Sequence, residues 1–430
     1  MSTETTLSRG GGVLTEGDGS EGTSYAIIEP VPGPVGKIEL EQRMGKIISD
    51  FEEHLIDRRA HHLGYPYNFD FDFSKLENIH KFSVNNLGDP FVTSNYGIHS
   101  RKFEVGVLQW FARLWEIDER DMWGYITNCG TEGNLHGILT GREVLPNGIL
   151  YCSRATHYSV PKASHMYRME LCLVNVNEND EICCVDLKKS LAGGKERGKP
   201  AIININIGTT VTGAIDSLKD VLRVLDELDY KKEEFYIHVD GALFGMMAPF
   251  MKQDDQLGSK VKMSFKYDID SISVSGHKFI GAPVPCGVII TRRKHISKLS
   301  KDIEYLNSKD TTIMGSRNGH AALYLWYAIQ CKGVEGFRLD TMECIKKAEE
   351  LKDALVATGI KATLGHASCT VVFERPASIE FVRKWQLACQ GNVAHVVVMP
   401  STSVEVLTTF VEELTIIRKS SPQSTIERET

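Results

Sequence analysis

Ser275-Gly276-His277-Lys278-Phe279 ends the apolar run Ile269 to Ser275 and precedes a loop rich in glycine and proline, residues 281–287. A second apolar run, Gly287 to Thr291, closes the loop. This order holds one lysine between a strand and a rigid turn, which suits an amine that forms covalent bonds to carbonyl groups. A lysine in an arbitrary loop is more often a solvated surface residue, so the interpretation depends on partners elsewhere in the chain.

The composition indicates a globular protein of more than one domain. The chain has 430 residues, of which 42% are apolar and 24% charged. A net charge of −7 argues against a nucleic-acid partner. The longest apolar stretch, Ala321 to Ile329, is too short to span a membrane. Ten cysteines without a CxxC pair predict a reducing, cytoplasmic location and no metal site.

Changes in composition predict five segments. Residues 1–35 are rich in Gly, Ser and Thr and are expected to be a disordered tail rather than a signal peptide. Residues 36–95 combine a helical pattern, Gly36 to Leu63, with a turn-rich stretch typical of a pocket wall. We expect a large cofactor-binding domain over residues 96–319, a smaller C-terminal α+β domain over 320–418, and a frayed tail over 419–430.

The pattern of residues in the expected large domain predicts an α/β fold. An amphipathic helix is expected over Arg101–Trp115, and a glycine-rich turn, Gly124 to Asn134, opens a helix that runs to Val144. Strand-like runs then alternate with helices such as Ser159–Met169 and Leu218–Leu228. The expected strands are Ile149–Ser153, Leu171–Val176, Ala201–Ile207, Phe235–Asp240, Ile269–Ser275 and Gly287–Thr291. This alternation predicts a mostly parallel sheet with helices on both faces.

The rest of the chain predicts a flap and a compact second domain. Residues 298–319 are polar and resemble a mobile flap. Helical patterns follow from Ala321 and again over Met342–Leu355. The other expected elements are strands Thr370–Glu374 and His395–Met399, a helix Glu380–Cys389 between them, and a last helix Val404–Ile417.

Polar residues follow several strands at the edge where α/β proteins form their sites. They are His157, Thr209, Asp240, Ser275, His277 and Lys278. A lysine amine condenses with an aldehyde to an imine. If the aldehyde is pyridoxal phosphate, its phosphate needs N–H donors at a helix start, which Gly130 and Thr131 offer.

The cofactor ring sets two further requirements. Its pyridine nitrogen needs a carboxylate, which Asp240 supplies, and its faces need a flat partner and free space, which His157 and the small Ala242 supply. Taken singly, each feature has an ordinary structural interpretation: Asp240 is also typical of a turn that ends a strand, and the glycine-rich turn is also typical of a helix cap. Their coincidence at one sheet edge favours pyridoxal phosphate.

Two motifs resemble signatures of group II pyridoxal-phosphate-dependent amino-acid decarboxylases. They are His-Val-Asp-Gly-Ala at 238–242 and Ser-Gly-His-Lys-Phe at 275–279. Other segments are similar to the plant serine decarboxylases, which are close relatives of the plant histidine decarboxylases. These segments are 61–66, 85–91, 95–101, 128–134 and 314–320, and the resemblance extends from His61 to Ile417. Ala282 and Val284 stand where those relatives carry Cys and Met, which is a conservative difference.

The resemblance implies the aspartate-aminotransferase-like fold, fold type I, in a homodimer with a shared active site. It implies a lyase of ethanolamine biosynthesis that converts L-serine into ethanolamine and CO2. The alternative is decarboxylation of histidine or an aromatic amino acid by the same mechanism. A catalytically inactive relative kept as a binding partner, and a metalloprotein built on His and Cys, are the alternatives from other classes.

The resemblance also assigns residues. Lys278 would form the imine, Asp240 would pair with the pyridine nitrogen, and His157 would stack on the ring and border the substrate. Thr209 would lie near the phenolic oxygen of the cofactor. The phosphate ligands would be Gly130, Thr131, Ser275 and His277, with Ser316 from the second subunit. His99 and Asn86 would bind substrate, and Tyr305 on the flap would return a proton to Cα.

Overall fold

The computed structural model describes residues 27, 29, 31–251 and 264–420. The chain divides into one unit that ends at Ala60 and a second that begins at His61. Most of the expected tail at 1–35, and residues 421–430 of the expected C-terminal tail, lie outside the described residues. The proposed domain limits at 96 and 320 remain predictions.

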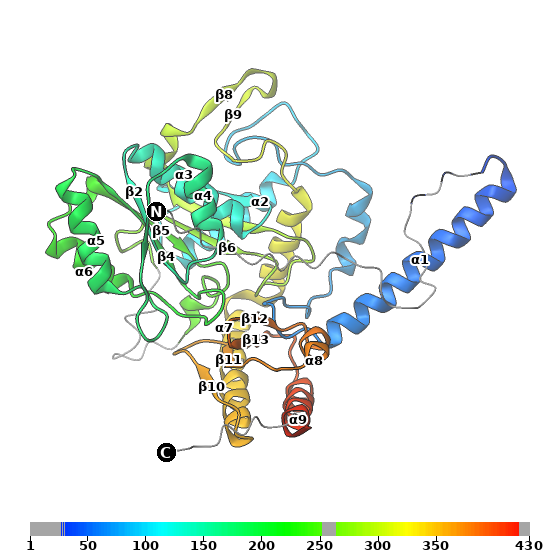
Figure 1. Cartoon of the computed structure of the whole chain (residues 1–430). Helices are drawn as coiled ribbons and strands as arrows, with labels where there is room; N and C mark the ends of the chain where they lie inside the picture. The colour runs from blue at the N-terminus through cyan, green and yellow to red at the C-terminus, as the bar shows by residue number, and fades with distance from the viewer. Residues whose placement is uncertain (1–26, 28, 30, 252–263, 421–430) are drawn as a thin grey trace, which may run out of the picture. The chain divides into compact units, whose positions relative to one another are not determined.

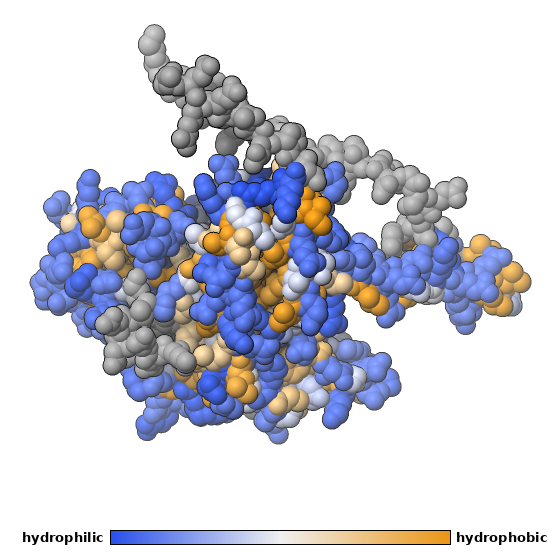
Figure 2. Space-filling view, turned by 90° about the horizontal axis from the view of Figure 1, so that it is seen from below, coloured by the Kyte–Doolittle hydropathy of each residue, from blue (hydrophilic) through white to orange (hydrophobic). Residues whose placement is uncertain are grey.

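The first unit contains one long helix, α1 (Pro34–Ala60), where the periodicity predicts a helix. Ile38, Ile48 and Phe51 on this helix are exposed to solvent. Figure 2 shows hydrophobic residues among the hydrophilic residues on the surface of α1. The helix therefore has an apolar side that its own unit does not cover.

The second unit is built on a seven-stranded sheet with the strand order β1-β7-β6-β5-β4-β2-β3. Six strands run in one direction and β7 runs against its neighbours β1 and β6. The strands are β1 (Met122–Thr127), β2 (Ile149–Ser153), β3 (Leu171–Val174), β4 (Ala201–Asn206), β5 (Phe235–Asp240), β6 (Ser271–Ser275) and β7 (Gly287–Arg292). The prediction of a mostly parallel α/β sheet is confirmed.

Strand β1 was missed by the sequence interpretation, which assigned residues from Gly124 onward to a turn. Gly124 lies inside the strand, and a side chain at this position would collide with the Ile289 carbonyl of β7. A glycine in a strand often marks such a close approach of two backbones, but it also resembles a turn signal. The pairing with β7 decides the outcome here.

Helices cover both faces of the large sheet, as the alternation predicts (Figure 1). On one face lie α3 (Gly130–Val144) and α4 (Ser159–Tyr167); on the other lie α5 (Cys184–Glu196) and α6 (Leu218–Glu227). Alternate residues of the strands therefore enter separate apolar clusters. Leu150, Ile202 and Tyr236 pack with α3 and α4, whereas Ile149, Ile203 and Ile237 pack with α5 and α6.

A second sheet lies in the C-terminal part of the chain, with the strand order β10-β11-β13-β12. It consists of β10 (Ala362–Leu364), β11 (Thr370–Glu374), β12 (Ala388–Gln390) and β13 (Val393–Val397). The helices beside it are α7 (Gly319–Ala357), which departs from helical geometry at Gly333, α8 (Ile379–Lys384) and α9 (Val404–Ser420). The expected helix over 380–389 was too long, because Ala388–Gln390 pairs with β13 instead.

The remaining elements border the large sheet. Helix α2 (Arg101–Leu114) contacts β1, where an amphipathic helix was predicted. The expected flap contains a hairpin of β8 (Lys301–Ile303) and β9 (Ser308–Asp310), which projects from the sheet in Figure 1. Short 3-10 helices lie at Ser74–Lys81, Lys232–Glu234, Ala248–Phe250, Arg293–Lys298 and Glu304–Leu306. Among the described residues, each helix is too short or too polar to cross a membrane.

Replacing Gly137 should destabilise the fold, because α3 packs very closely on β5. An added Cβ at Gly137 would lie far closer to Nδ1 of His238 on β5 than van der Waals contact allows. We expect Gly137→Ala to lower the free energy of unfolding by about 1–3 kcal/mol, measured by urea unfolding. The matched control is Gly193→Ala in α5, where an added Cβ meets open space and should stabilise the helix by up to about 1 kcal/mol. Equal stability of the two variants would contradict the packing argument.

Candidate active site

The carboxyl ends of the parallel strands bring the predicted residues to one edge of the sheet. Asp240 is the last residue of β5 and Ser275 the last of β6, and these strands are neighbours. Lys278 comes three residues after the end of β6, and Thr209 follows the end of β4 beside β5. His157 lies between β2 and α4. Sites of open α/β sheets form at this edge.

The amine of Lys278 lies in a poorly solvated position. Its Nζ makes no hydrogen bond or ion pair with any other residue that the structure describes. Burial lowers the pKa of Lys278, and the nearby charge of Asp240 opposes this shift. An unprotonated lysine amine is a nucleophile, so the environment favours reaction with a carbonyl group.

The Asp240 carboxylate is buried and held from two sides. Its Oδ2 accepts a hydrogen bond of 2.7 Å from Asn134 Nδ2, and its Oδ1 accepts one of 3.1 Å from the Ala242 backbone N–H. The carboxylate keeps acceptor capacity beyond these two bonds. Its geometry suits an interaction with a protonated ring nitrogen. Asn134, which donates one of these hydrogen bonds, had no role assigned from the sequence.

Two histidines lie within electrostatic range of Lys278. The pKa of His157 is lowered by burial, raised by the charge of Asp240 and lowered further by Lys278. Its Nδ1 is 2.8 Å from Ser159 Oγ, which fixes the ring orientation. Burial also lowers the pKa of His277, whose Nδ1 lies 2.9 Å from the Cys286 carbonyl oxygen. Both rings are therefore favoured in their neutral form.

The N-terminus of α3 has the features of an anion-binding site. A side chain at Gly130 would collide with Ser275 Oγ, so the helix backbone lies directly against the end of β6. Cys129 makes no side-chain hydrogen bond to the first turn. The first N–H groups of a helix have no intrahelical acceptor and carry partial positive charge. Thr131, partly exposed in this turn, extends the same surface.

Three other residues predicted for the site are Thr209, Ser316 and Tyr305, which lie in different parts of the structure. Thr209 Oγ1 accepts a 3.0 Å hydrogen bond from the Ala214 backbone N–H. Ser316 is exposed, and its Oγ accepts a 3.1 Å hydrogen bond from Asn85 Nδ2. Tyr305 lies between β8 and β9 with 81% of its surface exposed. Among the described residues, no hydrogen bond or ion pair joins these three to Lys278, and their roles remain predictions.

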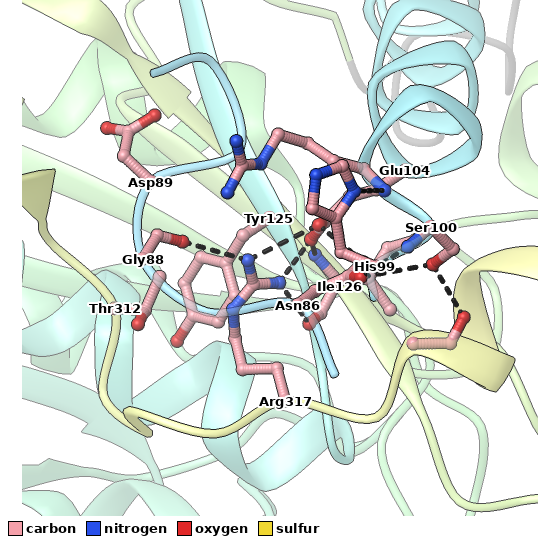
Figure 3. Close-up of polar contacts among 12 residues, drawn as sticks. Asn86, Gly88, Asp89, His99, Ser100, Glu104, Tyr125, Ile126, Thr312 and Arg317 are labelled. Carbon is pink, nitrogen blue, oxygen red and sulfur yellow. Dashed lines mark hydrogen bonds and ion pairs between the residues drawn. The ribbon is translucent and has the colours of Figure 1, made fainter. Parts of the chain in front are cut away.

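His99 and Asn86 belong to a polar cluster beside β1 (Figure 3). Asn86 Oδ1 accepts a 2.8 Å hydrogen bond from the Ser100 backbone N–H, and its Nδ2 donates to Glu104 Oε2 over 2.9 Å. His99 is partly exposed, and burial followed by the charge of Arg101 lowers its pKa. The Asn86 side chain thus has structural partners, and its role with substrate remains a prediction.

The centre of this cluster is a buried ion pair that the sequence interpretation did not identify. Arg317 and Glu104 are 2% and 0% exposed and form an ion pair. Arg317 Nη2 also donates to the Gly88 carbonyl oxygen over 3.0 Å, and Glu104 Oε1 accepts from the Ile126 N–H over 2.9 Å. Figure 3 shows the guanidinium reaching toward Glu104 from a separate segment of the chain. The pair links the C-terminal end of the expected flap to α2 and β1.

Comparison with known proteins agrees with this geometry. The pyridoxal-dependent decarboxylase conserved domain matches residues 99–373. The chain belongs to the pyridoxal-dependent decarboxylase family. It is 56% identical to serine decarboxylase 1 of Oryza sativa subsp. japonica over 91% of this chain and 80% of that protein. It is 48% identical to the histidine decarboxylase of Solanum lycopersicum over 87% of this chain and 89% of that protein.

Solved structures support the same fold. L-methionine decarboxylase from Streptomyces sp. 590 superposes with a TM-score of 0.80 at 25% identity, covering 87% of this chain and 95% of that chain. The glutamate decarboxylase of Lactobacillus brevis superposes with a TM-score of 0.74 at 17% identity, covering 94% of this chain and 96% of that chain. The predicted fold type I is therefore confirmed.

The protein is a pyridoxal-phosphate-dependent amino-acid decarboxylase, as the resemblance predicted. Its residues fit the cofactor on three observations. Lys278 offers an amine without a polar partner among the described residues, and Gly130 leaves a cradle that any side chain would fill. Asp240 offers a buried carboxylate with acceptor capacity. The three groups match an aldehyde, a phosphate and a pyridine nitrogen.

Breaking the Arg317–Glu104 pair should be costly. Glu104→Gln leaves the guanidinium charged and buried, and we expect about 3–5 kcal/mol less stability, measured by urea unfolding. Glu119→Gln is the matched control, because Glu119 pairs with Arg113 over 2.9 Å in an exposed position and should cost less than about 1 kcal/mol. Similar losses in both variants would contradict the structural role of the buried pair.

Proposed function

We propose that this protein decarboxylates L-serine to ethanolamine and CO2. The observation that carries the proposal is the 56% identity to rice serine decarboxylase 1 across nine tenths of the chain. Serine decarboxylase 2 of the same plant is 48% identical over 91% of this chain. The tomato histidine decarboxylase, also 48% identical, makes histidine the second candidate substrate.

Lys278, Asp240 and His157 would hold the cofactor. When bound, pyridoxal phosphate supplies an electron-withdrawing ring that accepts the electron pair left when CO2 departs. Lys278 would bind it through the amine, and Asp240 would keep a proton on the ring nitrogen. His157 would pack against the ring and exclude water from that face, and its neutral form would add no charge beside the pyridinium.

The phosphate would bind at the start of α3. The backbone of Gly130 and Thr131, together with Ser275 and His277, would offer N–H, hydroxyl and imidazole groups to the phosphate, and Ser275 lies directly against Gly130. Thr209 and Ala242 would border the ring, with Thr209 near its phenolic oxygen. His99 and Asn86 would contact the substrate, with Asn86 also anchoring the wall through Glu104. Tyr305 would deliver the proton that replaces the carboxylate on Cα.

We also propose a homodimer in which Ser316 completes the phosphate site of the second subunit. Ser316 is exposed, and Asn85 holds its hydroxyl, so the group is available to another chain in a defined position. The exposed apolar residues Ile38, Ile48 and Phe51 of α1 offer area for association. A cytoplasmic location fits the cysteines, all of which are free.

A substrate comparison tests the assignment. Purified enzyme with pyridoxal phosphate is incubated with L-serine or L-histidine, and CO2 and the amine are quantified by mass spectrometry. We expect ethanolamine from serine with a kcat/KM at least about tenfold above that for histidine, which corresponds to about 1.4 kcal/mol in the transition state. Lys278→Ala is the control and should abolish turnover. Histamine without ethanolamine would transfer the assignment to histidine.

Mixed dimers test the shared site. Chains with Lys278→Ala and chains with Ser316→Ala are co-expressed with different tags, and the heterodimer is purified. If Ser316 serves the partner's site, one site carries both changes and the other carries neither, so activity should return to about half of wild type at limiting cofactor. If Ser316 serves its own chain, the mixed dimer cannot exceed half the activity of the Ser316→Ala homodimer, which would refute the proposal.

A further inference from the structure

Asn134 connects helix α3 to the neighbouring strands β5 and β6. Its Nδ2 lies 2.7 Å from Asp240 Oδ2 and 3.0 Å from Ser159 Oγ. Its Oδ1 lies 3.0 Å from His238 Nε2 and 2.6 Å from Ser273 Oγ. Asn134 is 2% exposed, so water does not compete for these bonds. Both amide hydrogens and both carbonyl lone pairs therefore have partners.

The Asp240 carboxylate determines the orientation of this amide. A carboxylate only accepts hydrogen bonds, so the atom of Asn134 that faces it must be the NH2 group. The opposite orientation would place two acceptor oxygens 2.7 Å apart in a buried position. Asn134 Oδ1 consequently faces His238 Nε2, and this nitrogen must carry the proton that it donates.

The tautomer of His238 determines the next two bonds. Burial lowers the pKa of His238 to about 4, so the ring is neutral at physiological pH and its Nδ1 is an acceptor. Ser271 Oγ lies 2.8 Å from Nδ1 and must donate to it. The Tyr236 hydroxyl, 2.9 Å from Ser271 Oγ, then donates to the serine. The four hydrogen bonds from Tyr236 to Asp240 all point toward the carboxylate.

Glycines on α3 make this chain possible. Cβ atoms at Gly133 and Gly137 would meet Ser273 and the His238 ring, respectively, at less than van der Waals distance. Asn134 lies between these glycines and is the residue whose side chain enters the narrow gap between helix and strands. A larger gap would leave its amide out of reach of either Asp240 or His238.

We propose that Asn134 and His238 are positioning residues that hold the Asp240 carboxylate in a fixed orientation through a one-way chain of hydrogen bonds starting at Tyr236. The proposal rests on the proposed role of Asp240 at the ring nitrogen. Each donor places a positive hydrogen toward the carboxylate, so the aligned dipoles stabilise its negative charge. A carboxylate held in this way retains the proton on the cofactor ring nitrogen.

The tautomer of His238 is the first test, and it requires neither cofactor nor substrate. Apoprotein labelled with 15N-histidine is examined by NMR at about pH 7.5, and His238 is assigned from the signals missing in His238→Gln. We expect the proton on Nε2 and a bare Nδ1. A proton on Nδ1 would reverse the direction of the Ser271 bond, remove the donor to Asn134 and overturn the proposal.

Cofactor affinity and kinetics are the second test. Asn134→Asp keeps the shape of the side chain but replaces its NH2 donor with a second carboxyl group, so that two carboxyl groups face each other in place of a donor and an acceptor. We expect a cofactor Kd raised about tenfold or more and a kcat lowered about ten- to hundredfold, with KM within about threefold. Wild-type values of both Kd and kcat in Asn134→Asp would overturn the proposal.

Two substitutions at His238 separate positioning from general packing. His238→Gln keeps an amide N–H near the place of Nε2–H, whereas His238→Leu fills the space without a donor. We expect Gln to keep Kd and kcat within about threefold of wild type and Leu to lose about tenfold or more in both, with thermal unfolding measured for each. Equal losses in the two variants would indicate packing alone.

The outcomes distinguish this inference from the proposed function. The tautomer and the cofactor Kd do not depend on the amino acid that the enzyme decarboxylates. A protein with Nε2–H on His238 and weakened cofactor binding in Asn134→Asp, but without ethanolamine production, would refute serine as substrate and leave the positioning role intact. Ethanolamine production by a protein in which His238 carries its proton on Nδ1 would support serine as substrate and refute the positioning role.

Discussion

The close approach of helix α3 to strands β5 and β6 is the constraint on which the site depends. Gly130, Gly133 and Gly137 carry no side chains where α3 meets Ser275, Ser273 and His238. The helix backbone therefore lies against the strands rather than one side-chain layer away. This proximity brings the start of α3 beside the end of β6 and brings the Asn134 amide within hydrogen-bonding distance of Asp240.

Arg317 and Lys278 are two poorly solvated basic residues of the second unit, and the presence or absence of a counterion gives them different roles. Arg317 has Glu104 as its counterion and the Gly88 carbonyl as a further acceptor, so its charge is compensated. Lys278 lacks a hydrogen-bond or ion-pair partner among the described residues, and burial lowers its pKa. The first arrangement stabilises the contact between distant segments, whereas the second favours a reactive neutral amine.

Local sequence patterns were sufficient where the elements depend on their own residues. The strands Ile149–Ser153 and Phe235–Asp240 have the predicted limits, because a short apolar run between turn signals permits few other readings. Strand β1 was missed because it is stabilised by pairing with β7, which is distant in sequence. Strand β12 was missed although its partner β13 follows directly in the chain, because its three residues were assigned to the preceding helix. Asn134 and Arg317 fall within motifs that the sequence analysis recognised, yet nothing in their local sequence indicates their partners at Asp240 and Glu104.

The sequence by itself determined the alternation of strands and helices from Ile149 to Thr291 and therefore which residues follow those strands at the sheet edge. It also determined the chemical inventory of that edge, including Lys278, Asp240 and His157. The tertiary structure decided which of these groups are paired, which are desolvated, and in which direction the hydrogen bonds run. Local periodicity depends on near neighbours in the chain, whereas burial and hydrogen-bond geometry depend on residues more than a hundred positions apart, as the Asn134–Asp240 contact illustrates.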